Sequence, residues 1–186
     1  MKNILIVLIL VCVAFVSCDG RKSRSESLKT SVEEFNERQS DVFIVSYYPK
    51  DYTEVVTDTL IYNNVKVHIK NYSLPNESLF MSIIDKAVLI KQKQHRVFES
   101  DVVISTPSKE LLNTHISAEQ FKSMYPDEFW NQATLEHVWV NQELSTSNDV
   151  KLDISFINPS DNSYKLYRMS IDGDGQQEIE LIEERT

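Results

Sequence analysis

The alternation of hydrophobic and polar residues predicts a chain made mainly of β-strands from Asp41 onwards. Segment 65–72, VKVHIKNY, shows the pattern most clearly, because valine and isoleucine alternate there with lysine and histidine. The other segments with strand character are 41–48, 54–63, 78–85, 87–92, 96–106, 136–144, 150–157, 164–171 and 177–184. Segment 78–91 also fits an amphipathic helix, and that alternative stays open. Short polar connections, such as Asn63-Asn64, are typical of antiparallel hairpins.

Three short segments have the apolar spacing and end residues of helices. Apolar residues recur at helical spacing over 28–35, at Leu28, Val32 and Phe35. Ser117 is placed to cap a helix AEQFKSM, and Pro126 followed by two acidic residues begins PDEFWNQA. The predicted fold is therefore α+β, a mostly antiparallel β-sheet of about eight strands with a short helical insert before a C-terminal β-meander.

The amino terminus has the features of a signal peptide. Lys2 precedes an apolar run of 13 residues, ILIVLILVCVAFV, which ends at Ser17 and Cys18. A membrane-spanning helix needs about 20 apolar residues, so this run is too short to span a bilayer. A buried core helix is the alternative, but the run begins at the third residue and has no amphipathic period.

The four residues Phe15-Val16-Ser17-Cys18 resemble the lipobox of bacterial lipoproteins, with Phe15 in place of the usual leucine. The resemblance implies that the Cys18 thiol receives a diacylglycerol and that cleavage follows Ser17. Two or more acyl chains, such as palmitate, would then anchor the protein stably in a membrane. The expected organisation is a signal peptide at 1–17, a lipidated cysteine with a polar tether and a short helix at 18–40, and a single β-rich domain at 41–186.

Composition narrows the classes of function. The net charge of −9 disfavours nucleic acid as a partner. Glycine occurs three times, at positions 20, 173 and 175, which is too few and too scattered for a phosphate-binding loop, a dinucleotide fingerprint or a nucleophile elbow. The DGDG segment at 172–175 does not fit a calcium loop in either register, and a hairpin turn accounts for it. The four histidines lack metal-ligand spacing, so we expect no metal, no cofactor and no catalytic residue.

Beyond the lipobox, three other stretches resemble small lipoproteins of Bacteroidota that share a domain of unknown function. They are HISAEQFKSM, EHVWV and the closing LDISFINPSDNSYKLYRMSIDGDGQQEIELI. The resemblance implies a cell-envelope lipoprotein with no assigned activity. In such proteins an acidic run after the lipidated cysteine marks export to the cell surface, whereas here Cys18 is followed by Asp19 and then by basic residues. We therefore expect an outer-membrane protein that faces the periplasm, with surface exposure left open. The triplet Asp58-Thr59-Leu60 resembles an O-glycosylation acceptor and makes Thr59 a modification candidate.

Aromatic residues are the candidates for ligand binding. They form two groups, Tyr47, Tyr48 and Tyr52 around Pro49, and Phe129, Trp130 and Trp139 near the helical insert. Exposed aromatic rings stack on sugars or anchor protein partners, while buried ones fill a core. Both interpretations are open from sequence. Trp139 alternates with Val138 and Val140 on its strand, so it lies either under the insert or on the outer face.

Three hypotheses for function follow. The first is a lipid-anchored, non-enzymatic envelope protein that binds a protein or a glycan and is attached to the membrane through acyl chains on Cys18. The second is a periplasmic hydrolase that uses carboxylates brought together by the fold, among them Asp127 and Glu128. The third is a structural spacer. A pocket with paired acidic residues favours the hydrolase, and exposed aromatic residues favour binding.

Overall fold

The computed structural model describes residues 24–38, 42–86 and 89–185. The chain divides into two compact units, Met1–Val42 and Phe43–Thr186. The first unit contains helix α2 (Arg24–Arg38), which includes the predicted helical segment 28–35 and exposes Leu28 and Val32. The second unit holds the β-sheets. Strands make up 61% of the structure, and the predicted fold class is confirmed.

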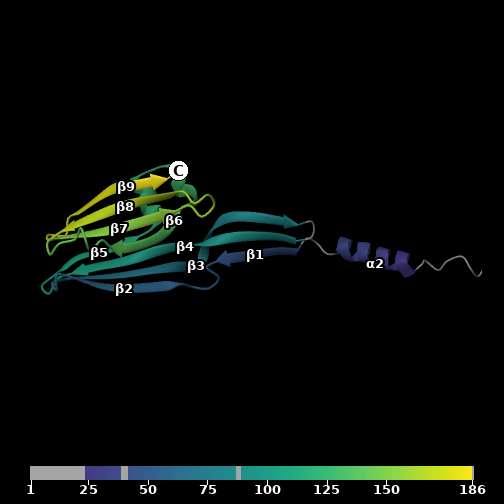
Figure 1. Ribbon diagram of the computed structural model, residues 1–186, viewed down its shortest axis with the longest axis horizontal. Coiled ribbons are helices and arrows are strands. Elements are labelled where there is room, and N and C mark those ends of the chain that lie inside the picture. The colour runs from purple at the N-terminus through teal and green to yellow at the C-terminus, as the bar shows by residue number, and fades with distance from the viewer. Residues whose placement is uncertain (1–23, 39–41, 87–88, 186) are drawn as a thin grey trace, which may run out of the picture. The chain divides into compact units, whose positions relative to one another are not determined.

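The first sheet has five strands arranged around a long hairpin (Figure 1). These strands are β1 (Val42–Tyr48), β2 (Glu54–Ile61), β3 (Val65–Lys86), β4 (Leu89–Ser105) and β5 (Glu110–Ile116). Their order is β1-β4-β3-β2, and β5 also pairs with β4. Ser46 of β1 contacts Gln92 of β4, and Tyr48, further along β1, contacts His95, further along β4. These two strands therefore run in the same direction, as Figure 1 shows, while the other pairs for which a register is given are antiparallel.

The second sheet is the predicted C-terminal meander. It comprises β6 (Thr134–Val140), β7 (Asp149–Ile157), β8 (Tyr164–Asp172) and β9 (Gln177–Arg185), hydrogen-bonded in that order. The predicted helical insert precedes it as α3 (Ala118–Met124) and a 3-10 helix, η1 (Glu128–Gln132). The Ser117 hydroxyl caps α3 by accepting from the Gln120 amide, and the Asp127 carboxylate caps η1 by accepting from the Phe129 amide.

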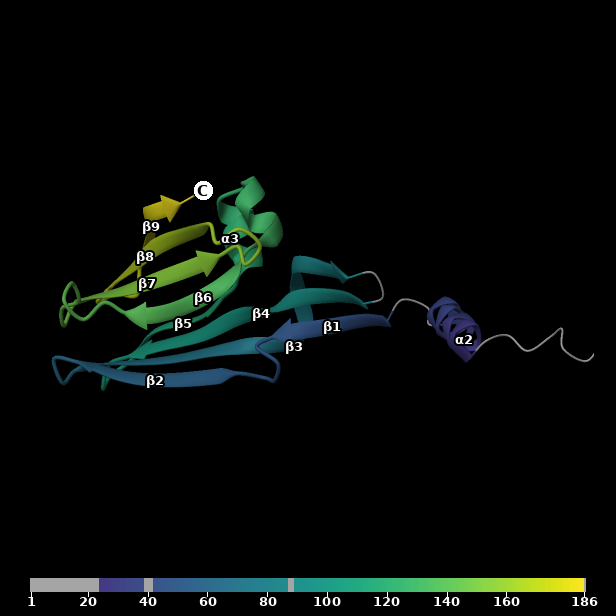
Figure 2. The same ribbon diagram turned by 45° about the vertical axis from the view of Figure 1, so that its right-hand side comes forward.

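A single hydrophobic core lies between the inner faces of the two sheets and the insert (Figure 2). Every second residue of β7 from Val150 to Phe156 is buried in it, as the alternation of strand side chains requires. The side-chain amide of Asn71 on β3 joins the sheets. It donates to the Val138 carbonyl of β6 and accepts from the Val138 amide, both at 3.2 Å. The Thr134 hydroxyl forms a second link by accepting from the Phe98 amide at 2.7 Å.

The structure differs from the predicted strand map in three respects. The predicted strands 65–72 and 78–85 are one continuous strand, β3, and 87–92 and 96–106 fall within β4. Irregularities between Ser73 and Ser78 and between Phe80 and Ser82 absorb the residues that look like breaks in the sequence. Strand β5 was not predicted, and the strands form two sheets. The DGDG segment is a hairpin turn, in which Gly175 has a φ of 88° and approaches the Leu111 carbonyl.

Candidate binding pocket

The structure separates the six aromatic candidates into core and surface residues. Phe129 and Trp130 are 9% and 4% exposed, and their rings contact each other. Trp130 also packs with Phe121, Phe156 and Tyr167. The Trp130 indole also donates to the Tyr125 carbonyl at 2.7 Å. Their rings therefore fill the core beneath the insert, and this corrects the interpretation of Phe129 and Trp130 as ligand-binding residues.

Trp139 lies on the outer face of the second sheet, which settles the choice left open by the sequence. It is 36% exposed, pairs across strands with Asp153 and stacks on His137 at 5.9 Å between ring centroids. Asp153 beside it is buried, and its carboxylate accepts from Arg168 at 2.7 Å and from Asn141 at 2.8 Å. Trp139 therefore offers one aromatic surface beside an ion pair that is already satisfied.

The three tyrosines near Pro49 are exposed but have different surroundings. The Tyr52 hydroxyl donates to Glu54 on β2, and hydrogen bonding to this carboxylate raises the pKa of Tyr52. The Tyr47 ring lies under the Arg96 guanidinium, 5.0 Å from its centroid. Tyr48 points to the opposite face of β1 and contacts the His95 ring at 5.6 Å. Of the three, Tyr48 alone lines the cavity described next.

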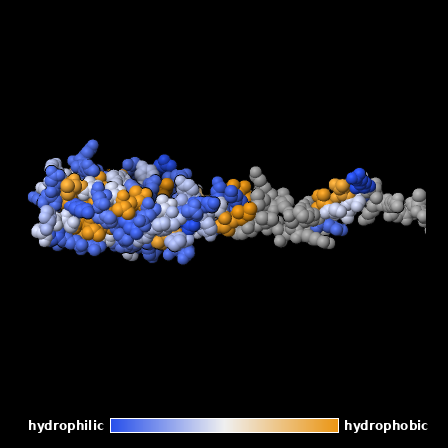
Figure 3. Space-filling view, turned by 90° about the horizontal axis from the view of Figure 1, so that it is seen from below, coloured by the Kyte–Doolittle hydropathy of each residue, from blue (hydrophilic) through white to orange (hydrophobic). Residues whose placement is uncertain are grey.

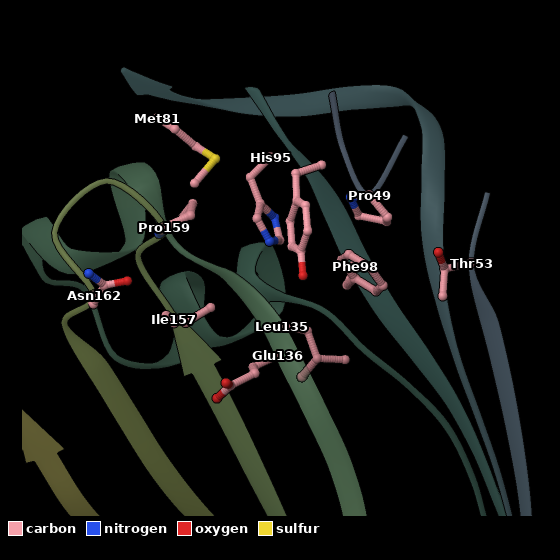
Figure 4. Close-up of a pocket in the computed structure, with 11 residues that line it drawn as sticks. Pro49, Thr53, Met81, His95, Phe98, Leu135, Glu136, Ile157, Pro159 and Asn162 are labelled. Atoms are coloured by element: carbon pink, nitrogen blue, oxygen red, sulfur yellow. The ribbon is translucent and has the colours of Figure 1, made fainter. Parts of the chain in front are cut away.

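A pocket of about 430 Å³ lies where the end of β1 and the middle of β3 and β4 meet the second sheet (Figure 4). Met81, His95 and Phe98 border one side, and Leu135 and Ile157 face them from β6 and β7. The complete lining is Tyr48, Pro49, Thr53, Met81, His95, Phe98, Leu135, Glu136, Ile157, Pro159 and Asn162. The volume is within the range of small-ligand sites, about 300–1,000 Å³. A second cavity of about 240 Å³ adjoins it and shares Tyr48 and Met81.

His95 is held as a neutral ring in the wall of this pocket. Its ring lies 5.6 Å from Tyr48 and 5.9 Å from Phe98, and its Nδ1 is 2.7 Å from the Arg96 carbonyl oxygen. Because a carbonyl only accepts, Nδ1 carries the proton and Nε2 has a free lone pair. Burial lowers the pKa of His95, and this effect outweighs the opposing hydrogen bond to Arg96.

Arg96 fixes the turns that border the pocket. Its guanidinium donates to the carbonyl of Pro49 at 3.1 Å, of Lys50 at 3.0 Å and of Pro75 at 2.6 Å. The planar, forked arrangement of five N–H donors in arginine suits this task, and lysine cannot reproduce it. Arg96 is therefore a positioning residue for the wall formed by Tyr48 and Pro49.

Glu136 is the one carboxylate that lines the pocket. A register shift in β6 between Leu135 and His137 leaves Glu136 without a partner residue on β7. Its Oε2 instead accepts from the Ser155 hydroxyl at 2.6 Å. A single carboxylate and a neutral histidine suit orientation of a ligand, whereas the proposed hydrolysis needs two carboxylates flanking one bond.

Elsewhere in the described ranges 24–38, 42–86 and 89–185, no group of three or more histidine, cysteine, aspartate or glutamate side chains is arranged to hold a metal ion. Within the same ranges, no helix is long and apolar enough to cross a membrane. Cys18, the predicted lipidation site, is outside the described residues. Thr59, the predicted glycosylation site, lies on β2 opposite the buried Val67 and is half-buried.

The sequence marked Tyr48 but not the other residues of the pocket. Met81 and His95 are 14 residues apart in the chain and meet because β3 and β4 form one hairpin. Leu135, Ile157 and Pro159 reach the pocket from the second sheet and its loop, a contact that no local pattern encodes. A scan of known protein families gives no match to the chain, and a search of curated proteins gives none either. The likeness to Bacteroidota lipoproteins thus remains a prediction.

Proposed function

We propose that this chain is a non-catalytic binding protein of a bacterial cell envelope, anchored in the outer membrane through acyl chains on Cys18. Its pocket accommodates an apolar group of a protein partner. The observation that carries the proposal is the composition of the pocket, in which seven of the eleven lining residues are apolar or aromatic. Apolar walls with few polar groups are typical of sites that bind by burying hydrophobic surface.

The hydrogen bonds that fix the loops on both sides of the pocket also support binding. Arg96 holds the turn that carries Pro49, and the Asn158 side chain organises the opposite loop by accepting from the Ser160 amide at 3.0 Å and donating to Asp161 at 3.1 Å. Side chains and loops that are already fixed in the unbound protein lose less conformational entropy when a ligand binds. The pocket is therefore suited to an anchor side chain of a partner protein.

A glycan is the second candidate ligand, and the observation that favours it is the exposed Trp139 stacked on His137. A sugar also needs hydrogen-bonding groups beside the aromatic ring. On this face Asp153 and Arg168 already bind each other, and the Asp153 carboxylate also accepts from Asn141. A protein ligand in the pocket therefore has the stronger support.

The direct test is photo-crosslinking in intact cells. A benzophenone amino acid is placed at position 48, which lines the pocket, or at position 62, where the native tyrosine is 71% exposed in the turn after β2. We expect position 48 to give a discrete protein adduct and position 62 to give none. The control combines the probe at position 48 with Met81→Glu, which places a charge in the pocket and should abolish the adduct.

Two outcomes would overturn the proposal. One is equal labelling from positions 48 and 62, which would mean collision with neighbours and no specific pocket. The other is an adduct that persists in full with Met81→Glu while circular dichroism shows that this variant is folded. An adduct that depends on the pocket would identify the partner by mass spectrometry.

A further inference from the structure

Part of the first sheet extends beyond the core as a three-stranded arm, made of β1, residues 78–86 of β3 and residues 89–96 of β4. The pairing of β2 with β3 ends at Tyr72, so β2 does not reach this region. Figure 3 shows a patch of hydrophobic surface at this end of the domain, and further hydrophobic patches among hydrophilic surface on the rest of it. The arm is therefore the part of the sheet with the fewest covering elements.

Large apolar side chains are exposed on both faces of the arm. Residues paired across strands share a face, so Ile84 lies with Lys91, and Ile83 lies on the other face with Gln92. Contacts of Tyr48 with His95 and of Tyr47 with Arg96 assign alternate residues of β1 in the same way. One face exposes Ile44, Tyr48 and Ile84, and the other exposes Tyr47, Phe80 and Ile83. A sheet in water normally keeps one face polar, so this arrangement indicates a partner.

The arm also has unpaired strand edges. Strand β1 is the outer strand of the sheet and pairs only with β4 among the described strands. The opposite edge, on β3, is interrupted by the irregularity between Phe80 and Ser82. Bulges blunt an edge against further pairing, whereas a regular strand remains open to it. Strand β1 is therefore the edge best suited to accept another strand.

The charge of the arm differs from that of the rest of the molecule. Lys91, Lys93 and Arg96 lie on its β4 strand, in a chain whose net charge is −9. Strand β9 has the complementary character. It is the last strand of the second sheet, and it exposes four glutamates together with Leu181 and Ile182. These glutamates are Glu178, Glu180, Glu183 and Glu184.

We propose that β1 of one molecule pairs with residues 177–181 of β9 of a second copy, so that the acidic edge strand extends the basic arm. The ladder of β9 with β8 shifts register after Leu181, so the regular part of β9 is residues 177–181. Backbone hydrogen bonds would satisfy both open edges, Glu178 and Glu180 on one face would lie on the side of Lys91 and Lys93, and Leu181 would lie on the other face. A lipid bilayer cannot satisfy open strand edges, which favours a protein strand over a membrane as the occupant. The contact joins different surfaces of the two copies, so it builds rings or chains. Tyr48 and Met81 lie in both the arm and the pocket, whereas Lys91, Lys93 and β9 are outside the pocket lining.

Sedimentation velocity of the full chain in detergent tests the proposal. We expect the mean mass to rise with protein concentration and to fall with added salt, because the contact includes exposed ion pairs. Two charge-reversed variants are compared with it, Lys91→Glu/Lys93→Glu in the arm and Glu178→Lys/Glu180→Lys in β9. Each alone should weaken self-association about tenfold or more, since like charges then face each other.

The two variants mixed together should associate again, because the reversed arm of one then meets the reversed β9 of the other. Lys66→Glu, a charge reversal at an exposed position of β3 outside the arm, should leave self-association unchanged. A chain that stays monomeric at every concentration would overturn the proposal. So would association that neither charge reversal weakens, or a mixture that fails to recover it.

Discussion

Arg96 fixes the wall of the pocket through its side-chain hydrogen bonds. Its guanidinium donates to the carbonyls of Pro49 and Lys50 in the loop after β1 and of Pro75 at the irregularity in β3. Charged hydrogen bonds of this kind stabilise by about 1.5–3 kcal/mol each when they are buried, and by less where water reaches them. The sequence gives no sign of this role, since Arg96 is simply the first residue of the predicted strand 96–106.

Arg96→Ala should therefore lower the free energy of unfolding by about 1–3 kcal/mol. Arg96→Lys should lose most of the same amount, because an ammonium cannot bind three separated carbonyls. Urea denaturation measures both, with Lys93→Ala on the same strand as the control. If Arg96→Ala and Lys93→Ala have equal stability, the positioning role of Arg96 is wrong.

His95 gives the pocket wall a pH dependence. Because burial lowers the pKa of His95 in the folded chain, the unfolded chain binds a proton first as the pH falls below the ordinary value of 6.5. The stability from the neutral ring is therefore complete above this pH and is lost as the pH falls towards the lowered pKa. His95→Phe should remove this component and flatten the decline between pH 7 and pH 5.

Unfolding free energies of the two proteins across this range provide the test. The other three histidines are present in both proteins, so the difference between the curves isolates His95. If the unfolding free energies of the two proteins changed with pH in parallel, His95 would not contribute this pH dependence. The sequence marked His95 only as a scattered histidine, because its burial depends partly on Tyr48, which lies on β1, far from His95 in the sequence.

At the scale of elements, Asn71 controls how the two sheets meet. It is 5% exposed, and its amide makes both a donor and an acceptor contact with the backbone of Val138. Replacement by alanine leaves two backbone groups of β6 without these partners. Such losses cost about 1–3 kcal/mol for each buried group.

Asn71→Ala should thus destabilise the protein by about 2–4 kcal/mol and speed hydrogen exchange at the Val138 amide. Asn113→Ala, at an exposed position on β5, is the matched control. Exchange at Val138 that stays as slow as in the wild type would show that Asn71 does not join the sheets.

The strands could be predicted from the sequence where one face is buried, as in β7 and β8, because apolar residues then alternate with polar ones. It failed where burial is partial. The sequence ELLNTHI of β5 does not alternate, yet the strand forms by pairing with β4. Pro75 and the polar residues near it look like a chain break but lie within β3, where the ladder with β4 shifts register. The division into two sheets depends on Asn71 and Thr134, which have no local signature.

At the scale of the whole molecule, the proposed function depends on the anchor. Wild-type protein should be processed after Ser17, labelled by palmitate and recovered with the outer membrane. It should resist protease in intact cells and be digested once the outer membrane is opened. Cys18→Ala should lose the label and leave the membrane fraction, because acyl chains supply the membrane affinity. Digestion of the wild type in intact cells would place the domain on the surface, and unchanged membrane binding of Cys18→Ala would refute lipidation.

Methyl NMR with indole as the probe shows whether the pocket beside Tyr48 binds an apolar group. If indole binds in the pocket, the methyl signals of Met81, Leu135 and Ile157 should shift until they saturate, because these three residues line it. Exposed methyl groups on β2, at Val56 and Leu60, should stay unchanged. Shifts of the β2 signals, with none at Met81, Leu135 and Ile157, would show that the pocket does not bind the apolar probe.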